Sequence, residues 1–308
     1  MSRSERTTTP SWPSRTATLL FVVSICWTVN QTTDPWHGLS REDLHFVGNV
    51  REVLVEEADI FSSSSGSREG VRSRVEWIAF DEDGRVTERI EFDRSGDPES
   101  TRRYTYADGL LILEEEYRRT RWPHETVAYT HEEDGRRTAA QVRTGDGTLR
   151  KTIVYERDEE GRLVSVIECG PSGDEIARVT CTYGTDGKRA DRYDPDGELA
   201  SWSVETFDAG GRLVELSLYT SGSEDAPFTI TYEYDSHGNV TLEETSGRPA
   251  MPFVITTSTS PETKTSYEYT VDDEGNWIKR VKSVWASSAD VPYWRAATAT
   301  YRSIRYDG

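Results

Sequence analysis

Residues 80–86 read Phe-Asp-Glu-Asp-Gly-Arg-Val, and this stretch decides the fold because it recurs along the chain. In each copy an aromatic residue precedes an acidic or polar turn, a glycine ends the turn, and a basic or apolar residue begins the next strand. The glycines lie at positions 84, 109, 135, 161, 187, 211, 238 and 275, with gaps of 24 to 27 residues and a last gap of 37. Such regular spacing predicts a repeat architecture.

The residue types in these stretches predict tight turns. An aspartate opens a turn by accepting hydrogen bonds from the backbone that follows it, and glycine adopts the positive φ that closes the turn. Further turn sequences lie halfway through several units, at residues 92–96, 145–147, 170–173 and 193–197. Each unit of about 26 residues therefore contains two strands and two turns, a hairpin arrangement.

The segments between the turns alternate as half-buried strands do. The alternation is clearest in residues 228–234, and in the strand after Gly84 it predicts Val86, Ile90 and Phe92 on the apolar face and Arg89 on the other. Sequential hairpins pair neighbouring strands in antiparallel fashion. We therefore expect an all-β fold, an extended twisted antiparallel meander of about eight two-stranded repeats that curls as its twist accumulates.

The three best copies, residues 80–86, 207–213 and 234–240, resemble the YD repeat of the Rhs and teneurin group. The resemblance covers about residues 75–308. In large members of that group the repeats build a sheet that spirals into a hollow shell around a C-terminal toxin or other domain. The resemblance implies a small secreted bacterial member without a toxin domain, with too few strands to close such a shell.

The first residues have the pattern of an export signal. Arg3, Arg6 and Arg15 precede the apolar run at residues 17–27. A basic start followed by a short hydrophobic stretch is typical of secretory signals. We predict that residues 1–29 form a signal peptide or an N-terminal anchor, and that the protein is periplasmic, on the cell surface or extracellular.

Cys26 follows Val23-Ser24-Ile25, which resembles a bacterial lipoprotein box, so Cys26 is a candidate lipidation site. The alternatives are an ordinary cysteine of the signal and an uncleaved anchor. Residues 30–43 are predicted to be a linker, and residues 44–308 the repeat sheet.

The overall charge narrows the class of partner. The formal net charge is −19, from 36 Lys and Arg against 55 Asp and Glu. Nucleic-acid binding is not expected, because phosphate contacts need clustered basic charge. No apolar stretch after residue 29 approaches the length of a membrane-spanning helix. Membrane contact is therefore expected only through the N-terminal segment or a lipid anchor.

No sequence pattern indicates an enzyme. The nucleophile elbow, the phosphate loop and the dinucleotide fingerprint do not occur in the sequence. We therefore predict no catalytic activity and no cofactor. A hydrolase that uses turn carboxylates is the least favoured alternative.

Two groups of residues are candidate binding sites. Acidic turns present oxygen ligands of the kind that calcium prefers, although an aspartate in a turn also serves the turn itself. Exposed tryptophans stack on sugar rings, although tryptophan also fills thin sheet cores. The calcium candidates are Asp81, Asp83, Asp194, Asp196, Asp272 and Asp273, and the carbohydrate candidates are Trp77, Trp202 and Trp277.

Cys169 and Cys181 are the cysteines that remain after removal of residues 1–29. The sequence does not decide whether a disulfide joins them. The favoured function is an exported scaffold or protein-interaction module at the cell surface or in the periplasm. The alternative is carbohydrate or cell-wall binding through exposed aromatic rings. The expected partner is accordingly an unidentified protein or a cell-envelope glycan.

Overall fold

A computed structural model describes residues 40–63, 66–223, 226–247, 263–286 and 293–307. These residues form 19 β-strands and no α-helix, so the all-β prediction is confirmed. No helix long and apolar enough to cross a membrane occurs among them. The predicted signal segment and Cys26 lie outside the described residues.

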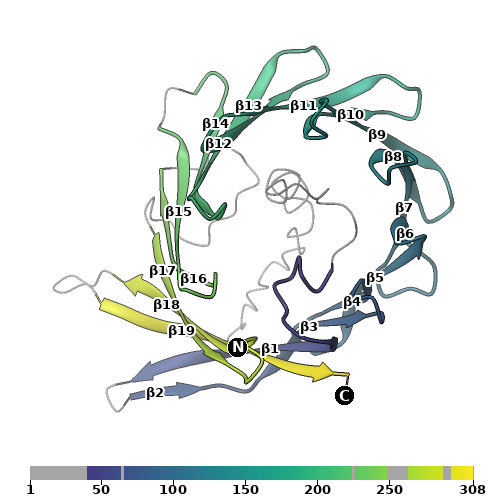
Figure 1. Ribbon diagram of the computed structural model, residues 1–308. Helices are drawn as coiled ribbons and strands as arrows, with labels where there is room; N and C mark the ends of the chain where they lie inside the picture. Colours follow the sequence, from purple (N-terminus) through teal and green to yellow (C-terminus); the bar gives the residue numbers. More distant parts are fainter. Residues whose placement is uncertain (1–39, 64–65, 224–225, 248–262, 287–292, 308) are drawn as a thin grey trace, which may run out of the picture.

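The strands follow one another along the whole described chain (Figure 1). The first ten are β1 (Val50–Ser63), β2 (Gly66–Glu69), β3 (Ser73–Phe80), β4 (Val86–Phe92), β5 (Pro98–Ala107), β6 (Leu110–Tyr117), β7 (Glu125–His131), β8 (Arg137–Thr144), β9 (Leu149–Arg157) and β10 (Leu163–Cys169). The others are β11 (Glu175–Tyr183), β12 (Gly187–Tyr193), β13 (Leu199–Phe207), β14 (Leu213–Thr220), β15 (Phe228–Tyr234), β16 (Val240–Ser246), β17 (Thr263–Val271), β18 (Trp277–Ala286) and β19 (Tyr293–Tyr306).

The sheet closes into a barrel. Every strand from β3 onward pairs in antiparallel fashion with the next strand, and β1 pairs with both β3 and β19. Among the described strands, the short β2 pairs only with the end of β1, so 18 of these 19 strands form the ring. The antiparallel meander is therefore confirmed, whereas the prediction of an open, extended sheet is wrong.

Two features account for the closure. The strand register slips by one residue beside many turns, as between Ala79 and Phe80 in the β3–β4 pair. Such bulges increase local twist and bend the strand, which curls the sheet. The long strand β1 then lies between the two ends of the meander, where Val53 stands opposite both Ile78 and Ile304.

Apolar side chains gather on the inner face of the barrel. Residues 40–49 lie inside the ring (Figure 1), and Phe46 of this segment packs edge-on against Phe80 with ring centroids 5.8 Å apart. Val53, Ile78 and Val86 belong to the same buried cluster. A second inner cluster comprises Val127, Ala140, Val142, Ile153, Tyr155, Leu163 and Val166.

The strand register shows that one prediction of side-chain orientation was wrong. Val86 lies opposite Phe80, and Arg89 lies opposite Ile78, so both point to the inner face. Ile90 lies opposite Trp77 on the outer face. The bulge after Val86 shifts the alternation by one residue, so the prediction that Val86 and Ile90 share a face was wrong.

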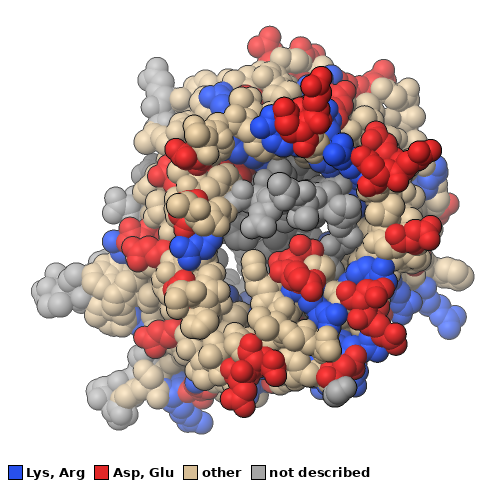
Figure 2. Space-filling model, viewed as in Figure 1, with Lys and Arg blue, Asp and Glu red and all other residues tan. Residues whose placement is uncertain are grey.

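On the face shown in Figure 2, charge is distributed around the ring rather than collected in one patch. In the space-filling view the acidic groups are spaced along the visible rim, and many have Lys or Arg beside them (Figure 2). Ion pairs between nearby residues, such as Arg162 with Asp158 at 2.7 Å, account for part of this pattern. On this face the acidic groups are therefore spread around the rim.

Candidate functional site

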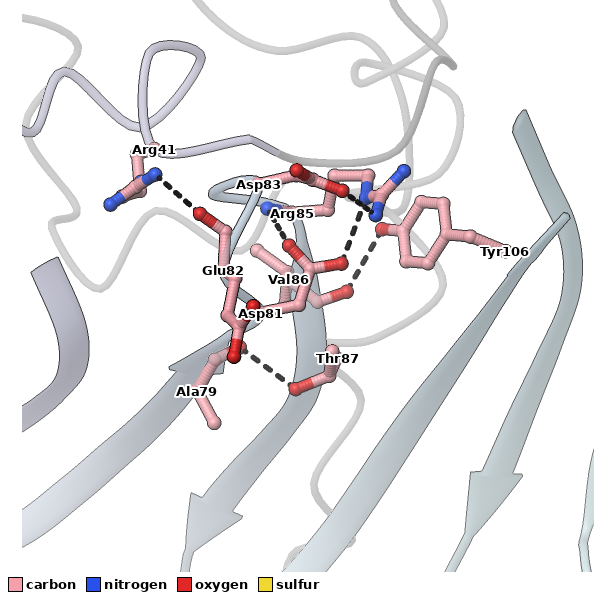
Figure 3. Close-up of polar contacts among 9 residues, drawn as sticks. All are labelled: Arg41, Ala79, Asp81, Glu82, Asp83, Arg85, Val86, Thr87 and Tyr106. Atoms are coloured by element: carbon pink, nitrogen blue, oxygen red, sulfur yellow. Dashed lines mark hydrogen bonds and ion pairs between the residues drawn. The ribbon is translucent and has the colours of Figure 1, made fainter. Parts of the chain in front are cut away.

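One carboxylate holds the turn at residues 81–85 (Figure 3). Asp81 Oδ1 accepts a hydrogen bond from the backbone N–H of Arg85 at 2.9 Å, and Asp81 Oδ2 accepts one from Arg85 Nε at 2.8 Å. Gly84 closes the turn with φ of 84°, a conformation that other residues adopt at a cost. The spacing of the aspartate, glycine and arginine therefore defines a turn with an internal ion pair.

A tyrosine of the next repeat unit contacts this turn. The Tyr106 hydroxyl donates a hydrogen bond to the backbone carbonyl of Val86 at 2.8 Å, and the Arg85 guanidinium lies 5.2 Å from the centre of the Tyr106 ring (Figure 3). Burial raises the pKa of the Tyr106 hydroxyl, which keeps it protonated as a donor. Each turn thus contacts the strand that enters the following turn.

The same contact recurs in three further turns. In each, an aspartate accepts hydrogen bonds from the backbone and side chain of the residue four positions later, and a tyrosine hydroxyl donates to the backbone carbonyl of the residue after that. The sets are Asp158, Arg162, Leu163 and Tyr183; Asp208, Arg212, Leu213 and Tyr234; and Asp235, Asn239, Val240 and Tyr269.

A modified copy of this contact stabilises the seam of the barrel, the place where β19 pairs with β1 and closes the ring. Asn276 exchanges two hydrogen bonds of 2.8 Å with the backbone of Val47, and its side-chain amide also donates to the Tyr306 hydroxyl at 2.7 Å. That hydroxyl donates to Asp272 Oδ2 at 2.5 Å. Asn276 is only 2% exposed. The last turn therefore joins the N-terminal segment to the last strand.

The six calcium candidates lie in three separate turns. Oδ1 of Asp81, Asp194 and Asp272 accepts backbone N–H groups of its own turn. Asp83 is paired with Arg85, and Asp196 and Asp273 are exposed. No three His, Cys, Asp or Glu side chains of the described residues are placed to hold a metal. The structure therefore does not bring the candidates into one site.

The three candidate tryptophans lie apart. Trp77 lies on the outer face between Leu54 and Ile90. Trp202 stacks on Tyr219 with ring centroids 4.9 Å apart, and Arg189 lies 5.1 Å from the Trp202 ring centre. Trp277 lies opposite Val271 on the inner face. These residues therefore share no surface on which one glycan would rest.

The inner face carries charge as well as apolar side chains. Four of its cations form ion pairs across neighbouring strands: Arg89 with Glu76, Arg102 with Glu114 at 3.8 Å, Lys151 with Glu168 at 3.1 Å, and Lys188 with Glu205 at 3.8 Å. A charge removed from water needs such a partner, because desolvation is costly.

Lys188 and Glu205 form the most buried of these pairs. Their side chains are 2% and 3% exposed, and neither Lys188 Nζ nor Glu205 Oε1 has a hydrogen-bond partner among the described residues. Burial raises the pKa of Glu205 to about 7, although Lys188 opposes the shift. Glu205 is therefore expected to change protonation state near neutral pH.

Sequence reasoning did not identify these inner-face charges. The signal was present in residues 187–190, Gly-Lys-Arg-Ala, because Lys188 and Ala190 are in phase on a strand. A charged residue in phase with a buried small residue indicates an inward charge.

Cys169 and Cys181 are free, so no disulfide joins them.

No protein-family model and no curated protein matches this chain. Solved structures with some similarity include a porin-like protein from Bacteroides uniformis, at 14% identity and a TM-score of 0.42, covering 88% of this chain and 100% of that chain. The Photorhabdus luminescens Tc holotoxin pore is 11% identical over 77% of this chain, with a TM-score of 0.25.

A TcdB2-TccC3 structure without its hypervariable C-terminal region is 9% identical over 79% of this chain, also with a TM-score of 0.25. The aligned part covers 16% of the holotoxin chain and 17% of the TcdB2-TccC3 chain. None of these similarities identifies a family, and the function is therefore inferred from this chain's own residues.

Proposed function

We propose that this protein is an exported, non-enzymatic YD-repeat scaffold of about eight units of about 26 residues, and that it binds a protein partner at the cell surface or in the periplasm. The recurring aspartate, glycine and tyrosine contacts support the repeat assignment. The basic and apolar N-terminal sequence supports export.

The observation that carries partner binding is the placement of exposed apolar side chains. Ten large hydrophobic residues are exposed among those described. Four of them belong to the β1–β2 and β18–β19 hairpins beside the barrel seam, and a fifth lies in the connection that follows β2. These five are Phe61, Val71, Trp285, Tyr293 and Trp294. Exposed apolar side chains gathered in one region are typical of interaction surfaces.

The backbone of the same hairpins offers free strand edges. Pairing between β1 and β19 ends at Asp59 and Thr298. Beyond that point β1 pairs only with β2, and β19 pairs only with β18, among the described strands. The two hairpins project from the ring in Figure 1. Unpaired backbone groups at a strand edge accept another strand, as in β-augmentation.

Charge on the two hairpins narrows the partner to an extended polypeptide segment in which apolar and acidic residues alternate. Arg68 on β2 and Arg295 on β19 are exposed, and neither forms an ion pair among the described residues. Acidic side chains on one face of the added strand would pair with these arginines, and apolar side chains on the other would contact Trp285 and Trp294.

The experiment measures peptide and glycan binding by matched variants. Peptides selected by the protein from a displayed library would be titrated into the wild type and into Trp285→Ser/Trp294→Ser. Trp122→Ser is the control, because Trp122 is 74% exposed in another loop. We expect the paired substitution to weaken binding at least tenfold and the control to leave it unchanged.

Soluble cell-wall glycans form the second arm of this experiment. Glycan binding that depends on Trp285 and Trp294, without peptide binding, would replace the proposal with the carbohydrate-binding alternative. Peptide binding unaffected by the hairpin substitutions, or no selected peptide at all, would overturn it.

A further inference from the structure

Three cations lie together on the inner face near the seam. Arg280 and Lys282 are on β18, and Arg302 is on β19. Arg280 stands opposite Thr300, two residues from Arg302, and Lys282 stands opposite Thr298. None of the three cations forms an ion pair with a described residue, unlike the four paired cations of the inner face.

Aromatic rings hold the two guanidinium groups close to each other. The Arg302 guanidinium lies 3.5 Å from the centre of the Trp277 ring and 4.6 Å from that of Phe46. The Arg280 guanidinium lies 5.3 Å from the same Trp277 ring and 5.3 Å from that of Tyr267. Two like charges therefore contact one indole ring.

The environment disfavours the charge of Arg302. Burial, together with repulsion from Arg280, lowers the Arg302 pKa to about 9, so the Arg302 side chain is still charged at neutral pH. Like charges in a partly dry site repel strongly because the effective dielectric constant is low. A bound anion would remove this repulsion.

The hydrogen-bond donors of the group are also incompletely used. Nε of both Arg280 and Arg302 is buried without a partner among the described residues. Arg280 Nη2 makes one long contact of 3.5 Å to the Thr300 hydroxyl, which itself donates to Glu57 Oε1. A buried donor without an acceptor is costly.

The carboxylates around the group form no ion pair with it among the described residues. Glu57, opposite Thr300, accepts the hydrogen bond of the Thr300 hydroxyl. Glu76, which attracts Arg302, is hydrogen-bonded to Arg89. Glu243 is attracted by Lys282 and Arg280 but forms no ion pair with either among the described contacts, and burial raises its pKa. The three cations therefore have carboxylates nearby but no ion-pair partner among the described residues.

We propose that Arg280, Lys282 and Arg302 bind a polyvalent oxyanion, of the phosphate or carboxylate class, on the inner face of the barrel. Planar guanidinium groups suit two-point binding of such anions, and the lysine adds a point charge. The proposal goes beyond the partner-binding function, because the projecting hairpin ends that carry Phe61, Trp285 and Trp294 take no part in it.

The test titrates the full chain with pyrophosphate and with citrate, against sodium chloride of equal ionic strength. We expect pyrophosphate, citrate or both to raise the melting temperature and to bind measurably by calorimetry. Arg280→Gln and Arg302→Gln should each weaken binding about tenfold or more, because each removes a charged hydrogen-bond donor. Binding of one anion alone assigns the phosphate or carboxylate class.

Matched variants separate binding from folding. Arg192→Gln is the control, because Arg192 lies on the inner face of β12, away from this group, and should leave binding unchanged. Without anion, Arg280→Gln should not lower the melting temperature, since it relieves repulsion. Lys282→Gln provides a third measurement if Arg302→Gln does not fold.

An equal loss of binding in Arg192→Gln would overturn the proposal. So would a melting temperature that responds to neither anion beyond the sodium chloride control. Both outcomes leave the hairpin experiment unaffected, so the two proposals fail separately.

Discussion

At the scale of single residues, Lys188 and Glu205 show how the inner face tolerates charge. The two groups are almost fully buried and 3.8 Å apart. Removal of one partner from a buried pair leaves an uncompensated charge, whereas apolar replacement of both is often neutral. At pH 8 we expect Lys188→Met to lower the free energy of unfolding by about 3 kcal/mol.

The double variant Lys188→Met/Glu205→Leu should recover most of that loss, and urea denaturation measures both. A double variant as unstable as the single variant would show that the pair stabilises the barrel on its own.

Glu205 also gives stability a pH dependence of known sign. Its pKa is about 7 in the folded protein, above the ordinary 4.5. The folded state therefore holds a proton that the unfolded state releases, so this contribution is complete below pH 4.5 and is lost as pH rises through 7. The change is on the order of 3 kcal/mol.

Glu205→Gln should remove this fall in unfolding free energy between pH 5 and pH 8, as measured by urea denaturation. Glu156→Gln, at an exposed position of β9, should keep it. Parallel wild-type and Glu205→Gln curves across that range would contradict the assignment.

At the scale of elements, the tyrosine hydroxyl couples one hairpin to the next. Tyr106→Phe removes the donor to the Val86 carbonyl without changing the ring. We expect a loss of about 1 kcal/mol in unfolding free energy, in the range for a single hydrogen bond. Tyr219→Phe is the control, because Tyr219 stacks on Trp202 and no hydroxyl hydrogen bond is found for it among the described residues.

Two glycines test different constraints on the turns. A Cβ at Gly145 would lie 1.9 Å from the backbone oxygen of Pro123, whereas a Cβ at Gly238 would meet nothing within 4 Å. Gly238 has φ of 84°, so alanine there costs only backbone strain, about 1 kcal/mol. Gly145→Ala should cost more than about 2 kcal/mol because backbone must move. Thermal melts of the two variants compare these costs, and equal losses would contradict the reasoning.

The turns were predictable from the sequence, but the register beside them was not. The roles of Asp81 and Gly84 could be predicted from their residue types, because both act within their own turn. The bulge after Val86 depends on the pairing of β3 with β4, and it reverses the facing of Arg89 and Ile90. For this reason the inward charges, including Arg280 and Arg302, were missed.

At the scale of the whole molecule, closure depends on contacts between distant parts of the sequence. Residues 44–308 were predicted to form the sheet, but nothing local in β1 specifies β19 as a partner. Asn276, Val47 and Tyr306 join three separate segments at the seam. Such non-local contacts form at a high cost in chain entropy, so we expect closure of the seam to be a slow step of folding.

A disulfide across the seam tests this dependence. Ala58 and Ala299 lie directly opposite each other in the β1–β19 pair and are 2% and 0% exposed. Opposed residues of antiparallel strands are about 4.5 to 5.5 Å apart at Cα, within the range of a disulfide. Ala58→Cys/Ala299→Cys closes a loop of most of the chain and should stabilise the oxidised protein by about 5 kcal/mol.

Leu113→Cys/Ala128→Cys is the control, because these residues are also directly opposed, in the β6–β7 hairpin. Its short loop predicts a gain of only about 3 kcal/mol. Urea melts with and without reductant, in a background with Cys169 and Cys181 replaced by serine, measure both gains. If the unfolded chain already holds β1 against β19, the seam disulfide gains no more than the hairpin disulfide, and closure is then not the costly step of folding.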